Sequence, residues 1–137
     1  MKHKVLFLCT GNSCRSQMAE AIVNARLSHR WQAFSAGTQP TGYVHPKAIE
    51  VLSEINIQHF GKSKSITEFK DQEFDLAVTV CDSAAEECPT WLNSGKQIHL
   101  SFPDPAKATG EDEQIQAKFR EVRNAISIQI PELLDKF

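Results

Sequence analysis

The segment between an apolar run and a helix-like stretch constrains this chain more than any other feature. The apolar run covers Val5–Leu8 and is typical of a buried strand, and a helical pattern begins near Gln17. Residues 9–16 must therefore form a tight strand-to-helix turn. Such a turn directs several backbone N–H groups at one point, at the positive end of the helix dipole. This arrangement is suited to holding a tetrahedral oxyanion.

The rest of the chain alternates between strand-like and helix-like patterns. The predicted strands cover residues 3–8, 31–35, 76–80 and 97–102, the predicted helices cover 16–28, about 46–55 and 112–136, and 61–73 has room for one more helical turn. Pro131 should kink or split the last helix. Strands separated by helices favour a parallel sheet that is covered on both faces. We therefore expect an α/β fold, a three-layer sandwich with a four-stranded parallel sheet flanked by helices, formed by residues 1–137 as one domain.

Composition argues against a nucleic-acid-binding, membrane or secreted protein. The net charge of −2 and the pI near 6.2 give no electrostatic case for a nucleic-acid or anionic-membrane partner. No apolar run is as long as a membrane span, and the first residues lack a signal-peptide cleavage site. We expect a cytoplasmic protein, where thiols stay reduced. Its four cysteines then indicate metal binding or redox catalysis more than a disulfide framework.

Cys9 and Arg15 bracket the turn. Donors that bind an anion also push a thiol towards thiolate, and an arginine can hold two oxyanion oxygens at once. Ser16, at the helix start, can donate its hydroxyl to the Cys9 sulfur. The expected oxyanion-binding residues are Thr10, Gly11, Asn12, Ser13, Cys14 and Arg15, with Gly11 allowing close approach and Asn12 tolerating positive φ. The alternative without a function is that Cys9 is a buried, inert cysteine at the end of a strand. The pattern C-x5-R by itself often arises by chance.

Cys81 and Cys88 follow the strand predicted at 76–80. If the residues between them were helical, the two Cα atoms would lie about 10 Å apart, whereas a disulfide needs about 4.4–6.8 Å. A bond between them would require the segment to unwind, which makes the pair a candidate redox switch. Two unrelated thiols or half of a zinc site are the alternatives. The cysteine spacings fit structural zinc poorly, and Arg15 beside Cys14 would repel a dication.

Asp104, within Pro103-Asp104-Pro105, is a candidate general acid on a rigid loop, although Asp-Pro turns are common as plain structure. It follows the strand predicted at 97–102. Since the carboxyl ends of parallel strands meet at one edge of a sheet, we expect residues 9–16, 81–88 and 104–105 to lie there together.

These motifs together resemble the thioredoxin-coupled arsenate reductases, which share the low-molecular-weight phosphatase-like fold. The resemblance spans nearly the whole chain. It rests on Cys-Thr-Gly-Asn-Ser-Cys-Arg-Ser-Gln-Met-Ala-Glu from Cys9, Ser35-Ala36-Gly37, Pro46-Lys47-Ala48-Ile49, Val78-Thr79-Val80-Cys81, Cys88-Pro89 and Asp104-Pro105-Ala106.

The resemblance implies a mechanism and its residues. Cys9 attacks arsenate held by Arg15 and the loop amides, with Ser16 favouring the thiolate, and Asp104 protonates the departing oxygen. Cys81 then attacks the Cys9 adduct and releases arsenite, and Cys88 resolves the resulting disulfide to Cys81–Cys88. Thioredoxin is the expected external reductant, with glutaredoxin and glutathione serving some relatives. We expect no tightly bound cofactor, no metal and no partner other than arsenate and the reductant. We also expect the protein to be a monomer.

The chain also departs from related proteins. Tyrosine phosphatases of this fold usually carry Pro where Gln17 stands and aromatic residues where Ala106 and Lys107 stand, so a phosphotyrosine pocket is not expected. Some of these reductases bind potassium through an Asn, a Glu, a Ser and an Asp. Asn12, Glu20 and Ser35 match, but Lys64 stands near the aspartate position. We expect its ammonium to take the place of the ion.

Two other functions stay open at this point. One is a small phosphatase that acts on phosphate esters through Cys9, Arg15 and Asp104. The other is a noncatalytic module that binds zinc or an oxyanion.

Overall fold

A parallel four-stranded sheet forms the centre of the protein. The computed structural model describes residues 2–81 and 96–137. Its strands are β1 (His3–Cys9), β2 (Trp31–Gly37), β3 (Leu76–Thr79) and β4 (Lys96–His99), in the order β2-β1-β3-β4. Every pairing is parallel. The expected α/β fold with a four-stranded parallel sheet flanked by helices is confirmed, and the C-terminal ends of all four strands meet at one edge.

The predicted fourth strand was too long at its C-terminal end. β4 ends at His99, although the chain beyond it still follows the sheet edge through two hydrogen bonds, Leu100 N to Thr79 O (2.9 Å) and Phe102 N to Val80 O (3.1 Å). Pro103 follows and has no N–H to donate, so no regular ladder continues past this point.

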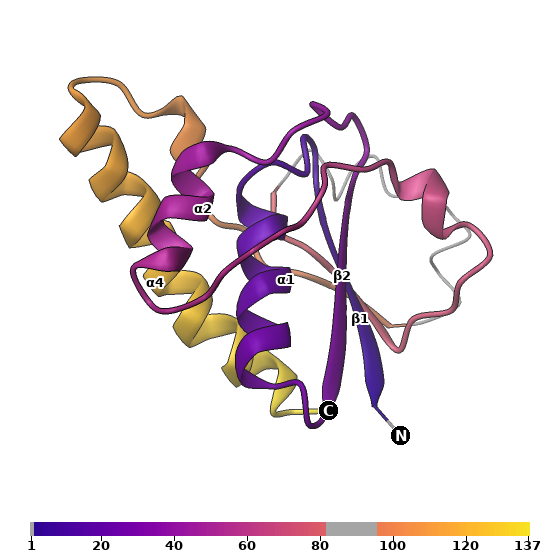
Figure 1. Ribbon diagram of the computed structural model, residues 1–137. Helices are drawn as coiled ribbons and strands as arrows, with labels where there is room; N and C mark the ends of the chain where they lie inside the picture. The colour runs from indigo at the N-terminus through magenta and orange to yellow at the C-terminus, as the bar shows by residue number, and fades with distance from the viewer. Residues whose placement is uncertain (1, 82–95) are drawn as a thin grey trace.

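Three α-helices cover one face of the sheet, namely α1 (Arg15–Arg26), α2 (Pro46–Ser53) and α4 (Asp112–Leu134) (Figure 1). The side of α1 that faces the sheet carries Met18, Ala19, Ile22 and Val23, all fully buried, at the spacing of one helical face. α4 continues past Pro131 to Leu134, so the expected split does not occur. Ile126, Ile130 and Leu134 are buried on both sides of this proline and keep the last turns packed on the core.

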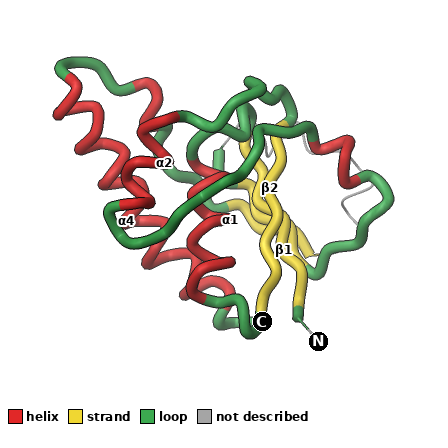
Figure 2. Tube along the Cα trace, in the orientation of Figure 1, coloured by secondary structure: helices red, strands yellow, loops and turns green. Residues whose placement is uncertain are grey.

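The opposite face of the sheet is covered, within the described residues, by the short helix η1 (Ile66–Phe69) (Figure 2). Successive side chains of a strand point to opposite faces, so Phe34 of β2 points away from its neighbour Ser35, which faces α1. Phe34, Phe69 and Phe74 meet edge to face, with ring centroids 5.6–5.8 Å apart. Because both faces are covered, β1 is buried from Val5 to Cys9, as its unbroken apolar run predicts.

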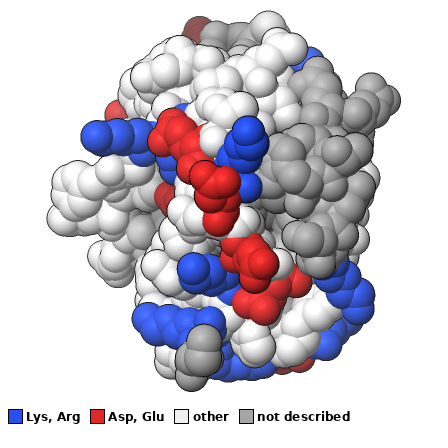
Figure 3. Space-filling model, turned by 90° about the vertical axis from the view of Figure 1, so that its right-hand side faces the viewer, with Lys and Arg blue, Asp and Glu red and all other residues white. Residues whose placement is uncertain are grey.

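The molecular surface carries charges of both signs. Figure 3 shows a band of acidic side chains across one face with basic side chains on either side of it. None of the described helices has the length and apolarity needed to cross a membrane.

A charged cluster joins the end of α2 to α4. Glu54 accepts from Arg120 Nε and Nη2 (2.9 and 2.6 Å) and from Arg123 Nη1 (2.9 Å). Arg123 also donates to the Val51 backbone oxygen at 2.8 Å. These hydrogen bonds, those from Arg120 above all, lower the pKa of Glu54 to about 2. The carboxylate thus fastens two helices that both lie on the same side of the sheet.

This cluster predicts acid sensitivity. The folded-state pKa of Glu54 lies below its ordinary value of 4.5, so its contribution to stability is fully present above pH 4.5 and disappears as the pH falls towards about 2. We expect Glu54→Gln to lower the urea midpoint at pH 7 and to approach wild type as the pH nears 2. Glu121→Gln, which removes only an exposed pair with Lys118, serves as the control. A gap between Glu54→Gln and wild type that is independent of pH would contradict the assignment.

Candidate active site

The loop between β1 and α1 lies at the C-terminal edge of the sheet, as expected. β1 ends at Cys9 and α1 begins at Arg15, so five residues make the turn. Pairing of Cys9 with Gly37 brings β2 against the base of the loop. A Cβ on Gly37 would lie only 2.6 Å from the Thr10 carbonyl oxygen and 3.0 Å from the Asn12 nitrogen. Only glycine allows this approach, and the loop is thereby pressed onto the strand.

The Cys9 sulfur is buried and receives two hydrogen-bond donors. Asn12 N lies 3.2 Å from Cys9 Sγ, and Ser16 Oγ lies 2.9 Å from it. The side-chain nitrogen of Asn12 donates to Ser16 Oγ at 2.8 Å, which leaves the hydroxyl proton of Ser16 for the sulfur. Two hydrogen bonds therefore converge on this one sulfur. The contact between Ser16 and Cys9 that the sequence predicts is confirmed.

Asn12 has a left-handed backbone, with φ of 49°. This conformation, which the sequence analysis allowed for, aims its N–H at the sulfur. The side chain is fully buried and its Oδ1 accepts from Lys64 N at 3.0 Å and from Gln17 Nε2 at 2.9 Å. An asparagine with these fixed partners is held in the left-handed region despite the steric cost.

Cys81 lies against the first residue of the loop. Its sulfur accepts from Thr10 N at 3.2 Å and lies 3.4 Å from Thr10 Oγ1. The register explains this placement, because Leu8 pairs with Thr79 and the two chains leave the sheet in parallel. The sequence thus correctly predicts that the 9–16 and 81 segments meet. Cys88 lies outside the described residues.

Arg15 and Asp104 face each other at the edge of the loop. Arg15 Nη2 lies 3.6 Å from Asp104 Oδ2, and Arg15 Nη1 donates to the Phe102 oxygen at 3.2 Å. Arg15 Nε is buried and has no hydrogen-bond partner within the described residues, so it is a donor ready for an anion. Asp104 also accepts from Ala106 N at 3.0 Å, which starts the short helix η3 (Pro105–Lys107) and fixes the carboxylate.

Several of the expected site residues line two cavities that share Arg15 and Asp104. A small cavity of about 140 Å³ is bordered by residues that include Cys9, Gly11, Ser13, Cys14, Arg15 and Asp104. A larger one of about 720 Å³ is bordered by Thr10, Cys81 and Asp104 among others. Arg15 and Asp104 line both, so an oxyanion bound between them would lie close to Cys9 as well. Two backbone nitrogens of the loop already donate to a sulfur: Thr10 N donates to Cys81 Sγ, and Asn12 N donates to Cys9 Sγ.

Cys14 is the last residue of the loop. Burial raises the pKa of Cys14 to about 12, and the nearby Asp104 and Cys9 add to this effect. Cys14 is therefore a neutral thiol at physiological pH.

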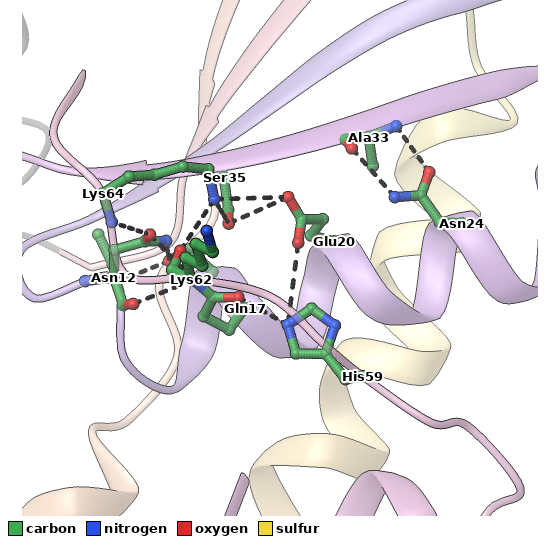
Figure 4. A network of polar contacts seen from close by, with 11 residues as sticks. Asn12, Gln17, Glu20, Asn24, Ala33, Ser35, His59, Lys62 and Lys64 are labelled. Atoms are coloured by element: carbon green, nitrogen blue, oxygen red, sulfur yellow. Dashed lines mark hydrogen bonds and ion pairs between the residues drawn. The ribbon is translucent and has the colours of Figure 1, made fainter. Parts of the chain in front are cut away.

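Lys64 places an ammonium group behind the loop. Lys64 Nζ lies 3.8 Å from Glu20 Oε1, 3.5 Å from Ser35 Oγ and 3.0 Å from the Lys62 oxygen (Figure 4). Burial raises the pKa of Glu20, and the ammonium and the Ser35 hydroxyl offset part of this rise. The expected position of the ammonium, beside Glu20 and Ser35, is confirmed.

Sequence reasoning missed four residues near the site. Gln17 and His59 support the loop from behind, and Tyr43 and His45 border the smaller cavity. His45 caps α2 by accepting from Lys47 N at 3.1 Å, and it stacks on Phe119. Pro46 after His45 was the available signal, because a proline at the first helical position marks the preceding residue as the cap.

Comparison with known proteins agrees with this geometry. Residues 4–137 match the family described as low molecular weight phosphotyrosine protein phosphatase. The chain belongs to this family. It is 43% identical over 133 residues to a protein of Halalkalibacterium halodurans named arsenate reductase, covering 94% of this chain and 93% of the relative. It is 37% identical over 137 residues to the arsenate reductase of Bacillus subtilis strain 168, covering 98% of each.

Solved structures of the family show the same fold. An arsenate reductase in the phosphate binding state has a TM-score of 0.78 and 27% identity, and the match covers 99% of this chain and 98% of that one. A low molecular weight protein tyrosine phosphatase from T. tengcongensis has a TM-score of 0.81 and 26% identity, with 99% and 100% covered. The resemblance drawn from the motifs is therefore confirmed at the level of the family.

Lys64 makes a prediction about monovalent cations that separates this chain from relatives with a potassium site. We expect its melting temperature and its catalytic rate to be the same in KCl and NaCl at equal ionic strength, because an ammonium already neutralises Glu20. Lys64→Asp should bind potassium and gain thermal stability in KCl over NaCl. Lys62→Asp, which makes the same charge change at an exposed side chain, should show no such preference. Stimulation of wild type by potassium over sodium would refute the idea.

Proposed function

We propose that this protein reduces arsenate to arsenite with three cysteines and is recycled by thioredoxin in the cytoplasm, which would serve arsenic detoxification. The observation that carries the proposal is the position of Cys81, whose sulfur is hydrogen-bonded to Thr10, the residue next to Cys9. Hydrolysis of a phosphate ester at Cys9 needs no second thiol. Transfer of two electrons does need one, and it needs that thiol close by.

The first step forms a bond between Cys9 and arsenic. The Cys9 thiolate, stabilised by Asn12 N and Ser16, attacks arsenate held by Arg15 and the loop amides. An As–O bond breaks, and Asp104 donates the proton that lets the oxygen leave as water. Arg15 neutralises the oxyanion charge through Nε and its terminal nitrogens.

The second step reduces arsenic. Cys81 attacks the Cys9 sulfur, so an S–S bond forms while the S–As bond breaks and its electron pair stays on arsenic as As(III). Cys88 then attacks Cys81, which frees Cys9 and leaves a Cys81–Cys88 disulfide. The dithiol of thioredoxin reduces that disulfide and returns the enzyme to its starting state.

The relay predicts distinct outcomes for two cysteine variants. Cys9→Ser should abolish arsenate-dependent NADPH oxidation in an assay coupled through thioredoxin and its reductase. Cys88→Ser should reduce about one arsenate per protein, because Cys9 and Cys81 then stay joined with no resolving thiol. Mass spectrometry of the non-reduced protein should find that disulfide. Normal turnover by Cys88→Ser would overturn the relay, and replacement of thioredoxin by glutaredoxin in the same assay identifies the reductant.

A phosphatase activity through Cys9, Arg15 and Asp104 is a second candidate. It is favoured by the facing Arg15 and Asp104, which a phosphate ester would also need, and by the similarity to a structure named as a tyrosine phosphatase. Phosphate has no accessible lower oxidation state here, so water would release the Cys9 adduct.

The two activities should separate by substitution. Cys81→Ser should eliminate arsenate reduction and leave hydrolysis of p-nitrophenyl phosphate unchanged. Asp104→Asn should lower kcat for that hydrolysis by about 100-fold or more, the usual contribution of a general acid. Cys9→Ser is the blank for both assays. Loss of ester hydrolysis in Cys81→Ser would show that Cys81 serves the fold and not electron transfer.

A further inference from the structure

Gln17 is a fully buried polar side chain that the mechanism above does not use. It lies on α1, behind the loop. Its Nε2 is 2.9 Å from Asn12 Oδ1, 3.1 Å from the Asn12 backbone oxygen and 2.8 Å from the Lys62 backbone oxygen (Figure 4). Three acceptors around one atom identify it as the amide nitrogen, which donates both of its protons among them.

The other end of the amide has a donor. Gln17 Oε1 lies 2.6 Å from His59 Nε2, so the ring must carry its proton on that nitrogen. Burial, together with Lys64, lowers the pKa of His59, and the neutral ring still donates from Nε2. A Cβ on Gly61 would overlap both His59 Nε2 and Gln17 Oε1, so this contact depends on a glycine.

Gln17 and the backbone N–H of Lys64 together set the orientation of the groups that follow. Because Asn12 Oδ1 accepts from both Gln17 Nε2 and Lys64 N, its Nδ2 must be the atom that faces Ser16 Oγ and donates to it. Ser16 is then left with its own proton for the Cys9 sulfur. The hydrogen bonds form a series that runs from His59 through Gln17, Asn12 and Ser16. In each of them the donor comes before the acceptor in this series, which ends at Cys9.

We propose that Gln17 is a positioning residue for the nucleophile, acting through Asn12 and Ser16 to hold the two donors that stabilise the Cys9 thiolate. This rests on the proposed function only in taking Cys9 as the nucleophile, and it applies equally to arsenate and to a phosphate ester. The competing view is that Gln17 merely fastens residues 59–64 to α1.

Alkylation of Cys9 by iodoacetamide separates these views, since it needs neither arsenate nor a reductant. We expect Gln17→Met to lower the rate at pH 6–7 by about five- to tenfold, the effect of weakening one hydrogen bond to a charged group. At high pH its rate should reach that of wild type. Mere loosening of the fold would instead expose Cys9 and raise the rate at every pH. Peptide mass spectrometry isolates Cys9 from the other thiols.

The other ionisable groups around the sulfur are unchanged in this variant. Within the described residues they are Cys14 of the loop, Arg15 at the start of α1, Cys81 after β3, Asp104 before η3, and Tyr43 and His45, which border the same cavity as Cys9. A shifted pH profile in Gln17→Met therefore reports the two donors.

Asn24 supplies a matched control. It is also a side-chain amide on α1, and it ties the helix to β2 through Ala33 O at 3.0 Å and Ala33 N at 2.9 Å (Figure 4). Asn24→Leu should lower the melting temperature without moving the alkylation profile. An equal shift in Asn24→Leu and Gln17→Met would overturn the proposal.

A second pair of variants decides the matter if Gln17→Met does not fold. His59→Leu removes the donor to Gln17 and should lower Cys9 alkylation at pH 6–7, whereas His59→Gln retains an N–H donor and should restore it. In a Ser16→Ala background, Gln17→Met should change the alkylation rate of Cys9 by a smaller factor. The reason is that one of the two donors through which Gln17 acts is already absent. Unchanged profiles in folded Gln17→Met, or in both His59 variants, would sink the proposal.

Discussion

The hydrogen bonds that converge on one buried sulfur are the interactions on which the rest of the site depends. Cys9 ends β1 and is almost inaccessible, so its sulfur finds hydrogen-bond donors only within the chain. Asn12 N and the Ser16 hydroxyl provide them, and both depend on a turn with a left-handed residue. The tight packing of Gly37 beneath the loop holds that turn against β2. Stability and reactivity are therefore linked at this point.

Strand register links the second sulfur to the first. Parallel pairing of β1 with β3 carries Thr10 and Cys81 out of the sheet side by side, and one N–H joins them. A shift of the register by one residue would turn Cys81 to the other face of the sheet. The proximity of Cys9 and Cys81, which are 72 positions apart in the sequence, is thus set by backbone hydrogen bonding in the sheet.

The sequence predicted the sheet and the loop because both produce local signals. An unbroken apolar run and a helical pattern enclose residues 9–16, and the carboxyl-edge rule brings Cys81 and Asp104 to them. Pro131 does not split α4, because the burial of residues on both sides of it outweighs the hydrogen bond that a proline removes from a helix. β4 ends at His99, and the chain beyond it follows the sheet edge only through Leu100 N and Phe102 N, up to Pro103, which has no N–H to donate.

The contacts that residues 59–64 make with the loop and with Gln17 could not be predicted from the sequence. His59, Lys62 and Lys64 lie more than forty residues beyond Gln17 and carry no periodic pattern, so their contacts with the loop arise only from folding. Lys64 was singled out through family resemblance, whereas Gln17 was noted only as a departure from proline. Two of the acceptors of Gln17 are backbone oxygens, which leave no sequence motif because any amino acid supplies the same acceptor.

Gly61 gives this arrangement an evolutionary consequence. Any side chain at that position would push His59 away from Gln17, so the imidazole and the amide can touch only while position 61 stays bare. Lineages that replace the glutamine are released from this demand, whereas lineages that keep it are not. Positions 17 and 61 should therefore vary together, because a side chain at position 61 would occupy the space in which Gln17 and His59 meet.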